Sequence, residues 1–296
     1  MIAINSYTTV KRRERVPQEI FAHYWRDVHG PLCSRLPGLG LYIQHHFSRN
    51  QDAHLWPLAD GISEIPDYEL DGGVEIGFTS EQDQQRFQQA SSILFSDEQN
   101  MFEETLAYDL PEGSNTLLNR CNDDRHNGPD LFDRIHLHVN PRSSLEDLHR
   151  YLVNDFQNLL ANAEGILKVR LHLCSPFIND GEHPPAPNVL HKATGARQEL
   201  AMVEVAFESP VARRRFFSSE QFVNSLPGQS AHIAQLKAFA VSGVYTYVSD
   251  GLLTTAGLRG SRAAELIEYL GAINQLSPEV EHLLLKGTLT PGSSAA

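Results

Sequence analysis

The alternation of apolar and polar positions along the chain predicts the same set of strands and helices twice. In the first half, residues 2–10, 38–47 and 72–79 have the composition of strands, and helices are expected to open at Pro17, Ser80 and Ser96. In the second half, strands are expected at 131–139, 166–174, 199–207 and 238–248, and helices at Ser143 and Ser209. The order β-α-β-β-α in each half is typical of a ferredoxin-like unit.

A repeated block of sequence supports this duplication. Residues 74–80 read Val-Glu-Ile-Gly-Phe-Thr-Ser, and residues 203–209, which lie 129 positions later, read Val-Glu-Val-Ala-Phe-Glu-Ser. A second pair of blocks at 95–99 and 217–221 is separated by 122 positions, so the first copy carries about seven extra residues. The repeat predicts an α+β protein built from two tandem β-α-β-β-α-β units.

We therefore divide the chain into three parts. The expected boundaries are 1–121 for the first unit, 131–250 for the second and 251–296 for a C-terminal helical tail, with a linker at 122–130. Two long polar segments, 48–71 and 175–198, are expected to be either lids and binding loops or solvated insertions.

The tail carries apolar residues at helical spacing. These are Leu266, Ile267, Leu270 and Ile273. Because an exposed stripe of this kind favours association, we expect it to be covered by this chain or by a partner subunit, and a homo-oligomer is left open.

Composition narrows the classes of partner. The chain has 296 residues, 41% of them hydrophobic, and a formal net charge of −13, which disfavours nucleic acid and anionic membrane surfaces and favours a small-molecule substrate. The three cysteines are scattered, so neither a disulfide framework nor a cysteine-rich zinc site is expected. No apolar run is long enough for a signal peptide or a membrane span, which predicts a cytoplasmic protein.

A histidine on the first helix is the leading candidate for chemistry. Phe21, Trp25 and His29 share one helix face, and Pro31 is expected to break or kink the helix, which would leave His29 near an open end. Spacing alone would equally allow a histidine that only caps the last carbonyls. However, the aligned position in the second half is Phe156, so the same helix is made there without a histidine. This difference favours a functional role for His29 as a general acid or base.

The residues around His29 resemble a known family. The pattern Phe21-x-x-Tyr24-Trp25-x-x-x-His29-Gly30-Pro31-Leu32, with Leu36-Pro37-Gly38 and Tyr42-x-Gln44-x-His46 after it, resembles the signature of EthD-type proteins of the dimeric α+β barrel superfamily. The resemblance implies that two ferredoxin-like units pair their sheets into a barrel, here within one chain, and that a pocket lies between sheet and helices. Relatives include isomerases, polyketide cyclases, decarboxylases or dehydratases, cofactor-free monooxygenases and, more distantly, haem-binding proteins.

The second strand supplies further candidates. Tyr42, Gln44 and His46 share one face of this strand because side chains alternate along it. If this face meets the first helix, the three side chains form a pocket wall near His29; otherwise they face solvent.

A second group of histidines is the only cluster in the sequence with the potential to hold a metal. His136 and His138 share a strand face, and His172 stands on a neighbouring strand. No carboxylate or thiolate stands at useful spacing beside them, and imidazoles on a sheet are more often hydrogen-bonded or exposed, so we expect no metal. Haem, which needs one axial histidine, stays an alternative. Nucleotide-loop, serine-hydrolase and zinc-protease motifs are absent from the sequence.

These observations lead to one expected function and two rivals. We expect a cofactor-independent lyase or isomerase acting on a small apolar oxygenated compound, by dehydration, decarboxylation or a related proton transfer. The expected catalytic residues are His29, His46 and Tyr42, and the expected substrate-binding residues are Tyr7, Phe21, Trp25 and Gln44. The rivals are a cofactor-free or haem-dependent oxygenase and a non-catalytic ligand-binding protein. The corresponding pocket of the second half is expected to be filled or inert.

Overall fold

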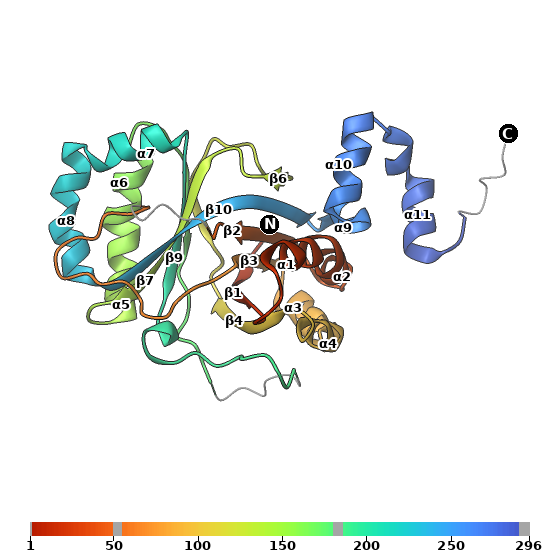
Figure 1. The fold of residues 1–296 in the computed structure, drawn as a ribbon, viewed down its shortest axis with the longest axis horizontal. Helices are drawn as coiled ribbons and strands as arrows, with labels where there is room; N and C mark the ends of the chain where they lie inside the picture. Colours follow the sequence, from red (N-terminus) through yellow and green to blue (C-terminus); the bar gives the residue numbers. More distant parts are fainter. Residues whose placement is uncertain (1, 50–54, 180–185, 290–296) are drawn as a thin grey trace.

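The computed structural model describes residues 2–49, 55–179 and 186–289, and Figure 1 shows their arrangement. The strands of the first repeat are β1 (Ile4–Arg12), β2 (Leu41–Phe47), β3 (Gly72–Phe78) and β4 (Phe102–Leu110). Its helices are α1 (Gln18–Tyr24), η1 (Trp25–His29), α2 (Gly30–Ser34), α3 (Glu81–Ala90) and α4 (Ser92–Glu98).

The second repeat follows the same order. Its strands are β7 (Asp133–Pro141), β8 (Ile166–His172), β9 (Ala201–Phe207) and β10 (Ile233–Ser249), and its helices are α5 (Leu145–Tyr151), η2 (Leu152–Phe156), α6 (Gln157–Ala161), α7 (Pro210–Phe217) and α8 (Glu220–His232). Between and after the repeats come β5 (Asn115–Asn119), β6 (Asn127–Pro129), η3 (Gly195–Gln198), β11 (Leu252–Leu253), α9 (Thr255–Arg259), α10 (Ser261–Leu270), η4 (Ile273–Leu276) and α11 (Pro278–Lys286). The predicted α+β class with two ferredoxin-like repeats is confirmed.

Local sequence placed most elements but missed some boundaries. Strand β4 is the final strand of the predicted β-α-β-β-α-β unit, but no residue range was predicted for it. Ser96, a predicted helix start, lies inside α4, where its hydroxyl donates to the carbonyl of Ser92. The cap of α5 is Ser144, one residue later than predicted, and its hydroxyl accepts from the backbone N–H of Asp147. Ser80 and Ser209 cap α3 and α7 as predicted. The predicted linker includes β6 and is ordered.

The sheets of the two repeats are joined because β10, the last strand of the second repeat, also pairs with the first repeat, and β5, which lies between the repeats in the chain, pairs with the second. The strand order is β4-β1-β3-β2-β10-β7-β9-β8-β5. The first part of β10 pairs with β7 of its own repeat, and its second part pairs with β2 of the first repeat. Similarly, β4 pairs with β1, and β5, which follows β4 in the chain, pairs with β8. The two ends of the strand order, β4 and β5, therefore follow one another in the chain and are joined by residues 111–114.

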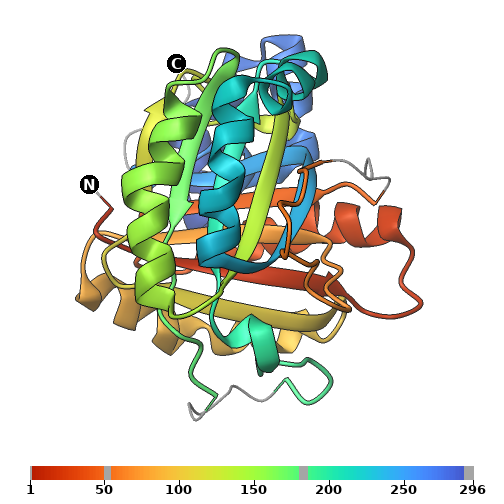
Figure 2. The same ribbon diagram turned by 90° about the vertical axis from the view of Figure 1, so that its left-hand side faces the viewer.

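Each strand presents one face to helices and the other to the barrel interior. Figures 1 and 2 show helices α5 to α8 outside the sheet of the second repeat and α1 to α4 outside that of the first. Apolar side chains fill the second helix–sheet layer, including Ile135, Leu137, Val203 and Phe156. The barrel interior combines aromatic and apolar residues with a buried charged cluster described below.

The first helix does not break at Pro31, which corrects the prediction. A single π-helical turn, η1, is inserted before α2, and the N–H of Gly30 donates to the carbonyl of Trp25, five residues back. Pro31 has no N–H for the next bond in this pattern, and the hydroxyl of Tyr247 donates instead to the carbonyl of Arg26 at 2.7 Å. The helix therefore continues to Ser34, and His29 is buried rather than at an open end.

The π turn is a property of the repeat rather than of the proline. In the second repeat, η2 occupies the equivalent place although Asn158 stands where the first repeat has Pro31. Such turns are common at functional sites.

The long segments that follow β2 and β8 each pack on the opposite repeat. Trp56 packs against Phe156 of the second repeat, and its ring N–H donates to Gln229 at 3.2 Å. Leu190 forms backbone hydrogen bonds of 2.8 and 3.0 Å with Glu103 and Thr105 of the first repeat. Their described parts are therefore packed segments, not solvated insertions. The predictions for residues 50–54 and 180–185 of these segments lie outside the described residues.

The apolar stripe of the tail is only partly covered by this chain. Ile267 is 9% exposed, whereas Leu266 is 48%, Leu270 74% and Ile273 80% exposed. Figure 1 shows α10 and α11 projecting away from the barrel. Within the described ranges, the structure contains no helix that is both long and apolar enough to cross a membrane. The predicted domain boundaries remain a prediction.

We predict that the exposed tail residues contact another subunit in solution. Introducing Leu270→Glu together with Ile273→Glu should lower the mass measured by light scattering, because charges oppose burial of this surface. The neighbouring exposed Asn274→Glu is the control and should leave the mass unchanged. Truncation after Asp250 should also lower the melting temperature, since it removes the buried Ala256 and Leu258. A monomeric mass for the unaltered protein would contradict this prediction.

Candidate functional site

A pocket of about 220 Å³ lies between the sheet and the helices of the first repeat. Strands β1 to β4 form its floor, and the first helix, α3 and α4 form its walls. Apolar side chains predominate in its lining, among them Val10, Trp25, Val74, Phe78, Phe87, Leu94 and Phe102. Its polar groups include His29, Tyr42, Glu98 and Thr105. The pocket suits a small, largely apolar ligand.

His29 reaches this pocket from the π turn of the first helix. Its Nδ1 lies 2.8 Å from a carboxylate oxygen of Asp97, and the two side chains are 8% and 13% exposed. The acceptor on Asp97 favours the tautomer with the proton on Nδ1. Nε2 then keeps its lone pair and can accept a proton from a ligand.

Asp97 is held in place by two further donors. The hydroxyl of Tyr24 donates to its second oxygen at 2.5 Å, and the side-chain amide of Asn100 donates to the same oxygen at 3.1 Å. Burial alone would raise the pKa of Asp97, but the hydrogen bonds from His29 and Tyr24 outweigh it and lower this pKa. Asp97 therefore stays ionised and orients the imidazole.

Glu98, the next residue, has the opposite behaviour. Burial raises its pKa to about 7, a hydrogen bond from Thr105 partly opposes this effect, and the charge of Asp97 adds to it. The Thr105 hydroxyl also lies 2.9 Å from Nδ1 of His191. A carboxyl group that titrates near neutral pH inside a pocket can donate or accept a proton.

The polar face of β2 meets the first helix as predicted, but only Tyr42 lines the pocket with His29. Gln44 donates to the Tyr42 hydroxyl at 2.7 Å and to the backbone carbonyl of Trp25 at 3.1 Å. His46 bonds to Gln44 at 3.0 Å and stacks on Trp25 with ring centroids 4.2 Å apart. Burial, Arg26 and His45 lower the pKa of His46 well below its ordinary value. Gln44 and His46 thus support the helix rather than border the pocket.

The aromatic residues predicted to bind the substrate, Tyr7, Phe21 and Trp25, lie on two different sides of the sheet. Trp25 lines the pocket, and Phe21 packs behind it against Trp25 and Phe102. Tyr7 points into the barrel interior, where its hydroxyl lies 2.6 Å from Nδ1 of His136. The expected place of Tyr7 beside Phe21 and Trp25 is therefore corrected, because odd-numbered positions of β1 face away from the helices.

The sequence contained a signal for the acidic residues that the prediction missed. Asp97 and Glu98 belong to the repeated block at 95–99, which served only to align the two halves. At the third position of that block the second copy has Ser219, just as Phe156 replaces His29. The paired loss of both members would have indicated that His29 and Asp97 act together.

In the second repeat, aromatic rings fill the space that corresponds to the pocket. Phe156 is fully buried, and Trp56 from the long segment after β2 lies 5.7 Å from it, centroid to centroid. Trp56 also contacts Phe216 and Phe222. This packing supports the prediction that only the first repeat carries a working pocket.

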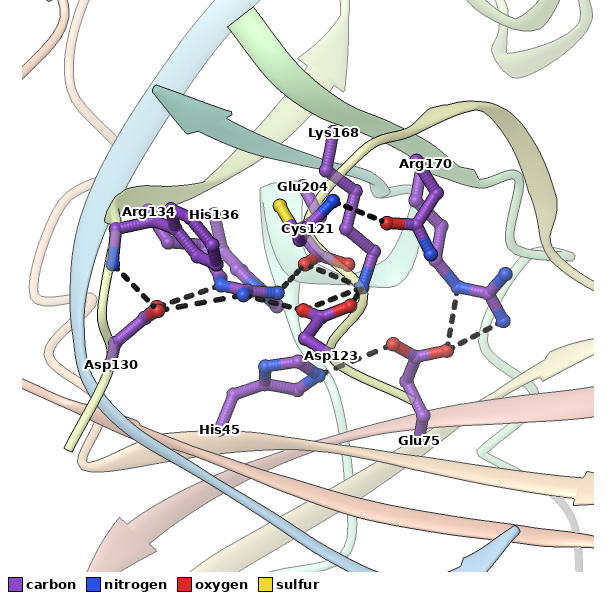
Figure 3. Close-up of polar contacts among 12 residues, drawn as sticks. His45, Glu75, Cys121, Asp123, Asp130, Arg134, His136, Lys168, Arg170 and Glu204 are labelled. Atoms are coloured by element: carbon purple, nitrogen blue, oxygen red, sulfur yellow. Dashed lines mark hydrogen bonds and ion pairs between the residues drawn. The ribbon is translucent and has the colours of Figure 1, made fainter. Parts of the chain in front are cut away.

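A second polar cluster lies inside the barrel, on the other face of the same sheet (Figure 3). Glu75 and Glu204, the glutamates of the repeated Val-Glu blocks, are both buried there. Arg170 pairs with Glu75 at 2.8 Å, while Lys168 at 3.1 Å and Arg134 pair with Glu204. Burial alone would raise the pKa of both glutamates, but these cations outweigh it and hold both pKa values well below the ordinary range.

The predicted histidine group belongs to this interior cluster. His136, His138 and His172 are fully buried, and burial lowers the pKa of His172 to about 4 and that of His138 to about 3. Glu75 and Glu204 lie beside them. The expectation that no carboxylate stands near these histidines is therefore wrong, because barrel closure brings together residues from strands far apart in sequence.

Comparison with known proteins identifies the first repeat. Residues 13–105 match the sequence profile of the EthD domain. This part of the chain resembles the EthD domain. This match includes His29, Tyr42 and Asp97, so most of the residues that line the pocket lie within the matched range. No curated protein matches the sequence significantly.

Solved structures support the fold of the EthD domain and its partner repeat. A candidate monooxygenase from Fusobacterium nucleatum subsp. nucleatum has a TM-score of 0.50 and 8% identity, over 86% of this chain and 97% of its own. An anthrone oxidase-like protein has a TM-score of 0.50 and 9% identity, again over 86% of this chain and 97% of its own. Because the identities are low, the likeness shows a common fold and not a common reaction.

We predict that Glu98 makes stability fall as the pH rises from about 4.5 to 7. The pKa of Glu98 in the folded protein is about 7, above the ordinary value of 4.5, so ionisation favours the unfolded chain in this range. Glu98→Gln should therefore be more stable than the unaltered protein at pH 8, by on the order of 2–3 kcal/mol, and no more stable at pH 4. Urea unfolding at both pH values measures this difference. The exposed Glu112→Gln is the control, and parallel pH profiles for the Glu98 variant and the parent would contradict the assignment.

Proposed function

We propose that the EthD-domain pocket catalyses a cofactor-independent proton transfer on a small apolar oxygenated compound. The observation that carries the proposal is the His29–Asp97 pair at 2.8 Å, with Nε2 of His29 left for a ligand in an apolar pocket. A histidine oriented by a carboxylate can act as a general base, and an apolar pocket favours substrates that lack charge.

Two further groups suit the oxygen atom of such a substrate. Burial raises the pKa of Tyr42 well above its usual value, so Tyr42 is a hydrogen-bond donor rather than a phenolate. Glu98, with a pKa of about 7, is partly protonated at neutral pH. In the proposed step, Nε2 of His29 takes a proton from the carbon beside a carbonyl, and the C–H electrons move to form an enolate. Tyr42 or Glu98 stabilises the enolate oxygen or protonates a leaving hydroxyl, as dehydration or isomerisation requires.

The names of the structural neighbours favour a second candidate, a cofactor-free oxygenase. One is described as a candidate monooxygenase and one as anthrone oxidase-like. The same enolate would then transfer electrons to molecular oxygen instead of being reprotonated. Both candidates share the first step, which can be tested without knowing the final product.

We predict that the protein exchanges carbon-bound hydrogen of enolisable ligands with solvent. Small cyclic ketones, lactones and anthrones would be incubated in deuterated buffer, and deuterium incorporation followed by NMR. His29→Ala should lower the exchange rate at least about 100-fold, because general acid–base groups contribute on this scale. Asp97→Asn should also lower it, since the imidazole loses its orienting carboxylate. His23→Ala, an exposed position on the same helix, is the matched control.

The outcome separates the rival functions. If the His29→Ala variant still catalyses hydrogen exchange at the rate of the unaltered protein, His29 is not the general base. If the unaltered protein binds a ligand but catalyses no hydrogen exchange, the result would favour a non-catalytic ligand-binding protein. Oxygen consumption that depends on His29 would favour the oxygenase, and a Soret absorption band in the purified protein would favour haem instead.

The second repeat provides an internal comparison for the same experiment. Phe156→Ala should lower the free energy of unfolding by about 3–5 kcal/mol, because it opens a cavity beside Trp56 in a packed core. The exchange rate per folded molecule should not change. A ligand bound only in the second repeat would contradict the proposed division of roles.

A further inference from the structure

We infer that the barrel interior holds a divalent transition-metal site formed by His45, His136 and Glu204. One ligand atom from each of these residues lies within 4.8 Å of the other two, and all three side chains are fully buried. Two imidazoles and a carboxylate form a donor set that zinc and iron(II) use in proteins. The inference concerns the opposite face of the sheet from the pocket and does not depend on the proposed function.

Atoms without partners point into this site. Among the described residues, Nδ1 of His45, Nε2 of His136 and Oε2 of Glu204 have no hydrogen-bond partner although they are buried. Leaving one such atom unpaired is costly, and three in one place call for a common partner. A metal ion accepts lone pairs from all three.

The other polar atoms of these three side chains form hydrogen bonds or ion pairs, as is usual for residues that bind a metal. Nε2 of His45 lies 3.2 Å from Glu75, and Nδ1 of His136 lies 2.6 Å from the Tyr7 hydroxyl. A ligating histidine typically donates its other ring N–H to a carboxylate or another acceptor, which fixes the ring. Arg134 and Lys168 engage Oε1 of Glu204 and leave Oε2 for the ion.

Hydrogen bonding beyond the site is consistent with a lone pair on Nε2 of His136. The Tyr7 hydroxyl is 3.3 Å from Nε2 of His138, whose Nδ1 is 2.8 Å from the Tyr68 hydroxyl. If every hydrogen bond in this series runs from His136 toward Tyr68, Nδ1 of His136 carries the proton and donates it to the Tyr7 hydroxyl. Nε2 of His136 then keeps its lone pair. Donation in the reverse direction would leave a buried N–H of His136 without an acceptor.

The charge of the interior also favours a cation. Three basic side chains lie in the cluster, namely Arg134, Lys168 and Arg170. They face four carboxylates, which are Glu75, Asp123, Asp130 and Glu204. Within this network the carboxylates outnumber the basic side chains by one, and a buried uncompensated charge is unfavourable. His172, whose Nε2 also has no hydrogen-bond partner, forms a separate group with Glu75 and Glu204.

The test measures metal content directly. Untagged protein would be expressed with added Zn²⁺ or Co²⁺, dialysed against metal-free buffer and analysed by mass spectrometry of its metals. We expect about one equivalent per chain, retained because the site is sealed within the barrel. Anomalous diffraction should place the ion between His45, His136 and Glu204. Folded protein that contains less than about a tenth of an equivalent, or an ion located elsewhere, would overturn the inference.

Matched variants distinguish a ligand from a merely buried histidine. His136→Gln and Glu204→Gln should each reduce metal content at least about tenfold. His138→Gln should retain the metal, because both nitrogens of His138 are already hydrogen-bonded although it lies on the same strand face. Circular dichroism checks the fold of each variant. If the ligand variants do not fold, the visible absorption bands of Co²⁺ in the unaltered protein report nitrogen and oxygen ligands, and their absence refutes the site. Equal metal loss in the His138 variant would also refute it.

Discussion

The pairing of strands across the two repeats is the constraint on which the rest of the structure depends. Because β10 continues from its own sheet onto β2, and β5, which follows β4 in the chain, pairs with β8, the two sheets form one continuous strand order. The side chains of the interior cluster are buried. Charged residues inside must find partners inside, and Glu75 and Glu204 do so with arginine and lysine side chains. Removing one member of such a network would leave its partner buried and unpaired.

Duplication then allows the two helix–sheet layers to differ without disturbing the barrel. Both repeats keep the π turn in the first helix, so the backbone frame of the layer is the same. In the helix–sheet layer of the first repeat, the pocket lies beside His29 and Asp97. In the helix–sheet layer of the second repeat, Phe156 and Trp56 fill the corresponding space. Trp56 comes from the first half of the chain, so the first repeat completes the core of the second. The filled layer contributes stability that a hollow layer does not.

Sequence alone predicted the fold and the helix that carries His29, because both depend on local patterns. Alternation placed Tyr42, Gln44 and His46 on the face that meets the helix, as the hydrogen bond from Gln44 to the Trp25 carbonyl confirms. What the sequence could not give was register and long-range pairing. The Asp97 contact with His29 spans 68 residues, and the meeting of Tyr7 with His136 spans 129. Both follow from how strands and helices pack in space, which no local signal encodes.

The register of β2 and β3 couples the pocket to the barrel interior. Along β2, Gln44 supports the helix side and His45 faces the interior, so a shift by one residue would exchange their environments. Two adjacent glycines oppose such a shift. A Cβ at Gly72 would collide with the Trp25 ring, and one at Gly73 would collide with the Tyr7 hydroxyl, on opposite faces of the strand. These two positions therefore fix how closely the helix approaches one face and how closely Tyr7 approaches the other. The position of the helix on the pocket side and the position of Tyr7 on the interior side thus depend on these two adjacent glycines of β3.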